Sequence, residues 1–453
     1  MTNPRLLLVN PPFPRKVAGV PLQLLYLAAA VKEADIPVEI LDLDIEPDEQ
    51  RKFILEERVK DFKPTHFGGT AYSPNYTELL EFMGHVKSFN SSVITISGGP
   101  HEIAVGDILP KHESIDYVVT DTFGELKLLS ILGSEKPIAR SLLFPAYELL
   151  KDSPQYQFDS ELFGGKRMTQ ILTATGCNMG CTFCSSQQEY SPFGNQVVIG
   201  QLRRVLNLGY KAVFINDPNF TNPFADPDDS NSKDSPHQYD RVLGLMKDIE
   251  KSQLNQELIW GCQTRADLVT PEVLDSMKSA GCTYITYALE TTDRASLQEQ
   301  HKASTPEKVQ KALSWSKERG IKTGLYVMFG VRPDPDEDFR IAQETLDFVE
   351  YLRPNYLSIS ILANYPMIDR AQYKIWAKGD RSKPAPRRNM NLDYANQRYS
   401  REPIWLNFDE GWGAFHPNTS IEQAQRYLKE LDKRKAEKPH IWNSDIPRAI
   451  RRF

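Results

Sequence analysis

Residues Thr173 to Ser185 read TATGCNMGCTFCS, and the interpretation of the whole chain starts from this stretch. Cys177, Cys181 and Cys184 stand in the spacing C-x3-C-x2-C. The residues before them, 168 to 174, are mostly apolar and β-prone, which predicts a strand that leads into a loop. Three thiolates from one short loop suit a soft metal or an iron–sulfur cluster. Structural zinc normally takes four protein ligands, so a zinc site would need a distant His.

Two glycines inside the stretch, Gly176 and Gly180, favour a tightly folded loop because glycine accepts positive φ. A [4Fe–4S] cluster held by three cysteines leaves one iron open for an outside ligand. The alternatives are three buried thiols or a zinc knuckle. The chain has only 5 cysteines, and packing alone is a poor reason for three of them to cluster.

Length and composition narrow the class of protein. The chain has 453 residues, with 40% hydrophobic and 25% charged residues, which predicts a folded protein of two or three domains. The net charge of −6 does not favour nucleic acid or an anionic membrane as a partner. The other two cysteines, Cys262 and Cys282, make no disulfide framework and are expected to pack in the core. No secretory signal and no apolar run of about 20 residues is seen, which predicts a cytoplasmic protein without a membrane span.

Residues 1–140 alternate short apolar strands with helical stretches. This pattern predicts a doubly wound α/β domain, with a parallel sheet and helices on both faces. Ligands of such sheets bind at the carboxyl ends of the strands. The loops expected at that edge carry the candidate binding residues Ser73, Gly98, Gly99, His101, Gly124 and Glu125.

The remaining chain divides into three parts. Residues 141–166 contain several prolines and a Gly-Gly pair, which indicates a linker. Residues 167–365 again alternate strand and helix in six units, too few for a closed eight-fold barrel. Residues 366–453 form a mixed C-terminal region that is expected to close the substrate side. It has a basic segment, 377–401, which is a solvated surface or a lid, and a final amphipathic helix at 421–435.

The cysteine loop, with Phe183 just before its third cysteine, resembles the radical S-adenosylmethionine (SAM) superfamily. The N-terminal part resembles the cobalamin-binding domain that precedes the radical SAM domain in one large branch of that superfamily. The segments that carry the second resemblance are LLLVNPP at 6–12, GGT at 68–70, ISGGPH at 96–101, and DYVV with GE between 116 and 125.

The resemblance implies a partial (β/α)6 barrel, with Cys177, Cys181 and Cys184 holding a [4Fe–4S] cluster. It also implies SAM contacts at strand ends, which fall on Asp217, Gln263, Arg265 and Glu290. The first domain would bind cobalamin. The chain lacks the D-x-H-x-x-G motif that supplies a His below cobalt, so cobalamin would be bound without a His lower ligand. A degenerate domain that binds no corrinoid is the alternative.

The expected activity follows from the same resemblance. A 5′-deoxyadenosyl radical would remove hydrogen from an unactivated carbon of a small-molecule or natural-product substrate, and methylcobalamin would supply the methyl group. A flavodoxin or ferredoxin would donate the electron. The alternatives are a radical SAM rearrangement, cyclisation, oxidation or decarboxylation without methyl transfer, and a non-catalytic corrinoid or redox sensor. A tRNA methylthiotransferase would need an additional trio of N-terminal cysteines, and residues 1–176 contain none.

Overall fold

The protein is described from a computed structural model, which covers residues 3–13, 19–72, 75–105, 111–121, 124–139, 142–151, 153, 156, 160–184, 186, 190–223, 239–362, 367–368, 387–388, 419–439 and 441–442. The chain forms two compact units. The first contains the chain up to residue 158, and the second contains residues 159–364 together with the C-terminal helix.

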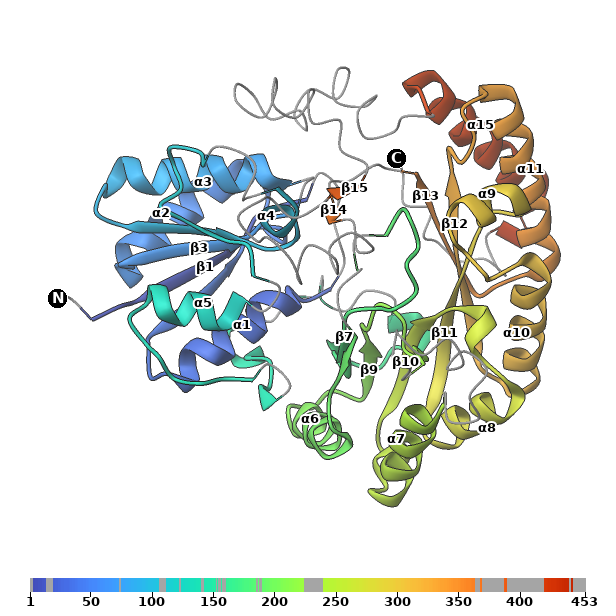
Figure 1. Cartoon of the computed structure of the whole chain (residues 1–453), viewed down its shortest axis with the longest axis horizontal. Helices are drawn as coiled ribbons and strands as arrows, with labels where there is room; N and C mark the ends of the chain where they lie inside the picture. Colours follow the sequence, from blue (N-terminus) through green and yellow to red (C-terminus); the bar gives the residue numbers. More distant parts are fainter. Residues whose placement is uncertain are drawn as a thin grey trace, which may run out of the picture. The chain divides into compact units, whose positions relative to one another are not determined.

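The first unit is a five-stranded parallel sheet in the order β2-β1-β3-β4-β5. Helices α2 and α3 cover one face, and α1 and α5 cover the other (Figure 1). This is the doubly wound α/β fold that the sequence predicts. The strands are β1 (Leu6–Asn10), β2 (Val38–Asp42), β3 (His66–Thr70), β4 (Ile94–Gly98) and β5 (Tyr117–Val119), and the helices are α1 (Leu22–Glu33), α2 (Arg51–Phe62), α3 (Tyr76–Phe89), α4 (Pro100–Val105) and α5 (Gly124–Ile131), with the 3-10 turn η1 (Asp48–Gln50) before α2.

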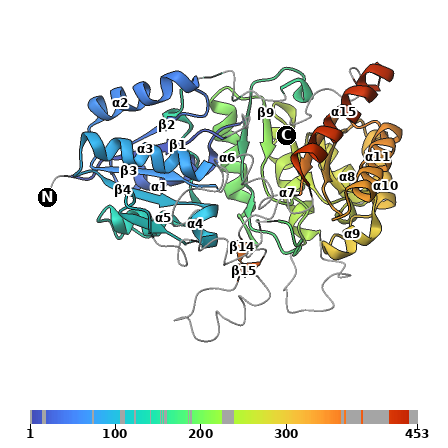
Figure 2. The ribbon, with the colours of Figure 1, turned by 90° about the horizontal axis from the view of Figure 1, so that it is seen from above.

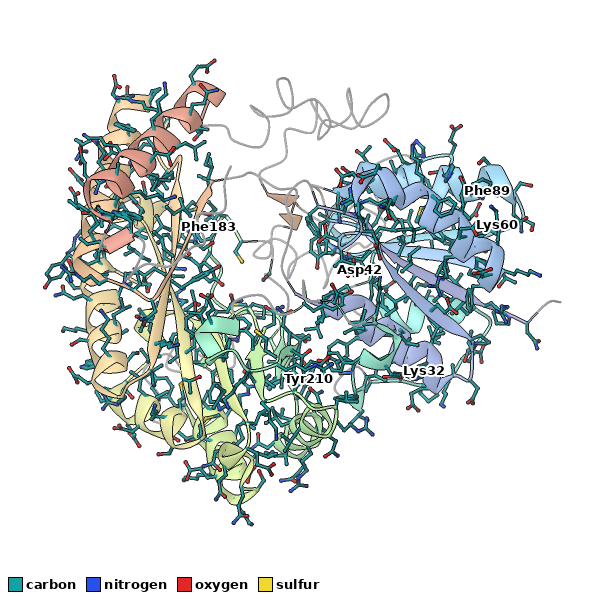
Figure 3. The ribbon with its side chains drawn as sticks, turned by 180° about the vertical axis from the view of Figure 1, so that it is seen from behind. Lys32, Asp42, Lys60, Phe89, Phe183 and Tyr210 are labelled. Atoms are coloured by element: carbon teal, nitrogen blue, oxygen red, sulfur yellow. The ribbon has the colours of Figure 1, made fainter. Side chains whose placement is uncertain are left out.

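The segment that follows α5 packs back onto the same unit. The Ala146 amide donates to the Leu25 carbonyl at 3.2 Å, just before the 3-10 turn η4 (Tyr147–Leu149). The Tyr156 hydroxyl donates to the Asp42 carboxylate at 2.9 Å. Figure 3 shows Asp42 at the edge where the strands end, far from Phe89 at the opposite side. The predicted linker 141–166 therefore contacts the carboxyl edge of the first sheet.

The second unit is a six-stranded parallel sheet in the order β13-β12-β11-β10-β9-β6, with helices on its outer face (Figure 1). The predicted partial (β/α)6 barrel is thereby confirmed. The strands are β6 (Met168–Ile171), β9 (Ala212–Ile215), β10 (Ile259–Thr264), β11 (Cys282–Glu290), β12 (Lys322–Phe329) and β13 (Tyr356–Ile361), and the helices are α6 (Asn195–Asn207), α7 (Asp240–Lys251), α8 (Pro271–Ser279), α9 (Arg294–Glu299), α10 (Pro306–Glu318) and α11 (Pro335–Leu352), with 3-10 turns η8 (Leu254–Gln256) and η9 (Ala266–Leu268).

A short turn before β6 fills the amino end of this sheet. The 3-10 turn η6 (Ser160–Phe163) places the Phe163 ring against Tyr284, with 6.0 Å between the ring centroids. A Cβ on Gly261 would lie 3.0 Å from that ring, so only glycine lets β10 approach it this closely. Cys262 and Cys282 are both fully buried in adjacent strands, as the sequence predicts.

The C-terminal helix α15 (Ile421–Glu437) lies along α11 (Figure 2). Its Tyr427 hydroxyl hydrogen-bonds the buried Asp338 carboxylate. Its Arg434 guanidinium donates to Glu350 at 3.2 Å, and the Trp442 indole donates to the same carboxylate at 2.9 Å. The predicted lid segment 377–401 lies outside the described residues except for Arg387–Arg388, the strand β15, which pairs with β14 (Met367–Ile368).

Candidate active site

The cysteine loop is closed at its base by a two-residue ladder. Strand β7 (Ala174–Thr175) pairs antiparallel with β8 (Ser191–Pro192). The Phe193 amide adds a 2.8 Å hydrogen bond to the Thr173 carbonyl. Inside the loop, Gly176 and Gly180 have φ of +73° and +68°, the left-handed conformation for which the sequence uses glycine. The cysteine loop thus begins and ends at this hydrogen-bonded ladder, which follows the carboxyl end of β6.

The three thiols come from one short loop, and Cys177 lies close enough to Cys181 and Cys184 to interact with both. Cys181 is buried, while Cys177 and Cys184 are partly exposed. Within the described residues, no three His, Cys, Asp or Glu side chains could hold a single metal ion. A cubane cluster binds one thiolate at each of three irons, so its ligands need not converge on one point. Three cysteines are one ligand short of a structural zinc site and match a cluster with one open iron, so the donor set fits a cluster better than zinc.

Burial governs the protonation of these thiols. It raises the pKa of Cys177 to about 11 and also raises the pKa of Cys184. Thiolates are the form that binds iron, so loading the site must release protons. Nearby positive charge favours that release, and two buried cations supply it.

The first cation is Arg265, which follows β10. Its guanidinium makes a bidentate pair with Asp267, with nitrogen–oxygen distances of 2.9 and 2.7 Å, and its Nη1 lies 3.7 Å from the Cys181 sulfur. Burial acts to lower the pKa of Arg265, but the pair with Asp267 outweighs it and raises that pKa. The predicted SAM contact Arg265 thus lies beside a cysteine of the loop.

The second cation, Lys302, follows α9 and is missed by the sequence reasoning. Its Nζ donates to Glu290 Oε1 at 2.8 Å and lies 5.7 Å from the centroid of the Phe183 ring. Burial acts to lower the pKa of Lys302, but attraction to Glu290 outweighs it and raises that pKa. Glu290, the predicted SAM contact at the end of β11, therefore faces the cysteine loop through Lys302.

Asp217 is placed differently from Arg265 and Glu290. Its carboxylate is completely buried, and Oδ1 accepts hydrogen bonds from the amides of Thr173 and Ala174 at 2.7 and 3.1 Å. Oδ2 accepts from the Thr173 hydroxyl, which itself accepts from Arg241 at 2.6 Å. Burial raises the pKa of Asp217. The carboxylate thus holds the backbone that enters the cysteine loop, and its contact with SAM stays a prediction.

Gln263 connects strands across the concave face of the barrel. Its amide nitrogen donates to the Asp217 carbonyl at 3.0 Å, and its amide oxygen accepts from the Tyr326 hydroxyl at 3.0 Å. Tyr326 on β12 and Arg241 on α7 are two further polar residues of the site that the sequence reasoning missed. Neither belongs to a motif, and a tyrosine in a strand or an arginine at a helix start is normally read as packing or solvated surface.

The first unit contributes a second set of predicted residues at the carboxyl ends of its strands. Gly99 has φ of +101°, and a Cβ there would lie 2.6 Å from the Thr70 side chain and 2.9 Å from the Ala71 carbonyl oxygen. Gly98 and Gly124 both pack against Val119. These glycines bring the turn after β4 against the end of β3. Ser73 lies outside the described residues.

His101 is held inside this edge. Its ring stacks on Tyr76 with 4.0 Å between the ring centroids, and burial lowers its pKa to about 3. The neighbouring Glu102 carboxylate accepts from the Ser97 hydroxyl at 2.5 Å, and Glu125 is buried at the start of α5. His66 lies at the opposite, amino edge, where it pairs with Leu6. This arrangement fits cobalamin bound without a His lower ligand.

Models of two known domains match this chain. The model of the radical SAM superfamily matches residues 171–349, and the model of the B12 binding domain matches residues 15–126. With these two domains in this order, the chain belongs to the cobalamin-dependent radical SAM family. Its cofactors are a [4Fe–4S] cluster, SAM and cobalamin.

Individual relatives are distant. An uncharacterised methyltransferase of Pyrococcus horikoshii is 24% identical over 410 residues, which is 82% of this chain and 83% of that protein. The radical SAM methyltransferase TsrM of Kitasatospora setae, with tryptophan substrate and a SAM analogue bound, superimposes with a TM-score of 0.61 at 17% identity, over 83% of this chain and 76% of that one. The cobalamin-dependent SAM radical enzyme OxsB gives a TM-score of 0.54 at 15% identity, over 96% of this chain and 62% of that one. The structures of TsrM and OxsB share the fold of this chain.

The structure adds one negative finding: among the described residues, no helix has the length and apolarity to cross a bilayer.

Proposed function

We propose that the protein is a cobalamin-dependent radical SAM methyltransferase that methylates an unactivated carbon of a small-molecule or natural-product substrate. One observation carries the proposal: a three-cysteine loop stands at the carboxyl edge of a half-barrel, in a chain that also has a B12 binding domain. The B12 domain gives a reason to prefer methyl transfer over the other radical SAM reactions. The methyltransferase relative in Pyrococcus horikoshii is a second, weaker support.

When bound, the cluster and SAM supply a carbon radical, and cobalamin supplies a methyl group to a carbon that is no nucleophile. The chain would hold the cluster through Cys177, Cys181 and Cys184. Arg265 would offset thiolate charge at Cys181, 3.7 Å away. Glu290 would accept hydrogen bonds from SAM, and Asp217 would fix the backbone before the loop. An external one-electron donor such as flavodoxin or ferredoxin would reduce the site.

At the first unit, Gly98, Gly99, Gly124 and the buried Glu125 would shape the floor on which cobalamin rests. His101 would pack against Tyr76, on which its ring stacks. Glycine at position 99 would let the turn after β4 lie against the end of β3 below the corrinoid, because any side chain there would collide with Thr70.

The first test is corrinoid retention. The protein is reconstituted anaerobically, incubated with hydroxocobalamin and desalted, and the corrinoid per chain is measured by absorbance. We expect near-stoichiometric retention with a spectrum that lacks a base ligand. A protein that retains no corrinoid but still cleaves SAM on reduction would contradict the methyltransferase proposal and favour a cobalamin-free radical reaction.

The product mass separates the remaining alternatives. Methylation adds one CH2 unit to the substrate, whereas a rearrangement, cyclisation, oxidation or decarboxylation does not. A corrinoid or redox sensor would bind its cofactors without forming 5′-deoxyadenosine.

A further inference from the structure

The backbone of Glu290 is strained in a way that helix ends do not explain. Six non-glycine residues of the described chain have positive φ, and five of them lie one or two residues after the end of a helix. Glu290 is the exception: it has φ of +64° in the last position of β11, where the pairing with β12 shifts register. A left-handed conformation for a residue with a Cβ costs energy and marks a place where the surrounding structure requires one geometry.

Lys302 is the group that fixes the Glu290 side chain. The two side chains are 4% and 10% exposed, and their 2.8 Å contact uses Oε1 of the carboxylate. Among the described residues, no side chain donates to Oε2. The carboxylate therefore has one oxygen held by Lys302 and one open to a ligand.

Helix α9 fixes the place of Lys302 itself. The Lys302 amide donates to the Leu297 carbonyl at 2.8 Å and the His301 amide to the Gln298 carbonyl at 3.0 Å. This is a Schellman end, with His301 at φ of +53° in the position that usually takes glycine. At the other end of α9, the Asp293 carboxylate accepts from the Ser296 amide at 2.9 Å.

The same segment contacts the cysteine loop at two points. The Thr182 amide donates to the Gln300 carbonyl at 3.2 Å, and Lys302 lies against the face of Phe183. Thr182 and Phe183 stand between the second and third cysteines. The buried Lys302 thus contacts the cysteine loop at Phe183 and the carboxylate of Glu290.

We infer that Lys302 is a positioning residue for SAM: it holds Glu290 so that the free carboxylate oxygen meets SAM at a fixed place relative to the cysteine loop. The inference rests on the proposed function, because that function supplies the contact between Glu290 and SAM. Lys302 acts through Glu290, and this separates it from a residue that binds SAM directly.

A double-mutant cycle on SAM affinity tests the inference. The full-length protein and the variants Lys302→Met, Glu290→Gln and the double variant are reconstituted anaerobically, and iron and sulfide are measured per chain. The dissociation constant of SAM is then determined by equilibrium dialysis. We expect each single variant to bind SAM about tenfold or more weakly, the loss that follows from a hydrogen bond to a charged group. The double variant should be no weaker than Glu290→Gln alone.

Two further variants sharpen the result. Lys302→Arg keeps the charge and should recover most of the affinity. Arg294→Met removes an exposed ion pair between α9 and Glu307 at the start of α10 and should leave affinity unchanged, since those side chains are 65% and 56% exposed. If Lys302→Met leaves a buried carboxylate unpaired and fails to fold, the comparison of Glu290→Gln with the neutral double variant still decides the question.

The outcomes separate this inference from the proposed function. Normal affinity in Lys302→Met with weak affinity in Glu290→Gln would overturn the role of Lys302 and leave the Glu290 contact intact. A double variant that binds about tenfold more weakly than Glu290→Gln would overturn it as well, because Lys302 would then act on its own. Normal affinity in Glu290→Gln would refute the SAM contact itself.

Discussion

Replacing Asp217 by Asn tests whether this residue builds the cysteine loop or binds SAM. The substitution keeps the size of the side chain but removes its charge and turns one acceptor oxygen into a donor. The Asp217 carboxylate accepts from two backbone amides and from the Thr173 hydroxyl, and Arg241 Nη2 lies 3.8 Å from it. In the variant, the new side-chain NH2 group would face the Thr173 hydroxyl, which already accepts a hydrogen bond from Arg241.

The cost can be worked out from these contacts. Two hydrogen bonds lose their charge assistance, which is about 0.5–1 kcal/mol each, and a third is lost, which is about 1–3 kcal/mol. The Arg241 side chain, only 9% exposed, also loses its countercharge. We expect Asp217→Asn to lower the free energy of unfolding by about 3–5 kcal/mol.

The assay is urea unfolding of the apoprotein, with hydrogen exchange of the amides of residues 173–175. Thr173→Val is the matched comparison, because it removes the hydroxyl that bonds Asp217 and Arg241 but keeps the carboxylate and its two backbone hydrogen bonds, and should cost about 1.5–3 kcal/mol. Iron bound after reconstitution should fall in Asp217→Asn. If the variant instead unfolds within about 1 kcal/mol of the wild type and loses SAM affinity, the positioning role is wrong and Asp217 is a SAM ligand.

Three further predictions concern other parts of the chain. Burial lowers the pKa of His101 to about 3, so between about pH 6.5 and pH 5 only the unfolded chain binds a proton at this residue. The free energy of unfolding should therefore fall by about 1.4 kcal/mol per pH unit as the pH is lowered through this range. Urea titrations should show that this slope is lost in His101→Gln. Gly99→Ala should destabilise the first unit by at least about 2 kcal/mol in thermal unfolding, because its Cβ would lie 2.6 Å from Thr70; an unchanged transition would contradict the close approach. Glu350→Gln removes a buried carboxylate that bonds Arg434, Lys438 and Trp442, while Arg434 keeps Asp347 and Glu430, and should cost about 1–3 kcal/mol, with α15 becoming the first site of proteolysis; unchanged protection would show that the apolar contacts of Tyr427 suffice.

The elements that the sequence predicts well are those with strong local patterns. Strands such as β1 (LLLVN) and β9 (AVFI) are short apolar runs, and the cysteine spacing is readable by itself. The start of a helix is harder to predict where a glycine interrupts the helical pattern. Helix α6 runs from Asn195 to Asn207 and contains Gly200, an interior glycine that weakens the helical pattern of its first turns. Helix α9 was missed altogether: its six residues are too few to show a helical period.

The side chains around the site were harder to predict because tertiary contacts decide their roles. Lys302 stands in QEQHKAS, which reads as solvated surface, and only the Schellman end of α9 turns it inward against Glu290. Asp217 was expected to face SAM because it ends a strand. Its actual partners lie 43 and 44 residues earlier in the chain, so no local pattern reveals them. Arg265 and Glu290 could be located because they end strands of a familiar barrel.

Helix α15 has a consequence for how the protein is made. Trp442 bonds Glu350 across 92 residues of sequence, and Tyr427 bonds Asp338 across 89. At about 5–20 residues per second, the ribosome needs roughly 5–18 seconds to add the covering segment after the acidic residues are made. During that interval Asp338 and Glu350 are hydrated carboxylates on the nascent barrel. The surface that α15 later covers also holds the rings of Phe329 and Phe339, so the two carboxylates supply charge beside those rings until α15 arrives.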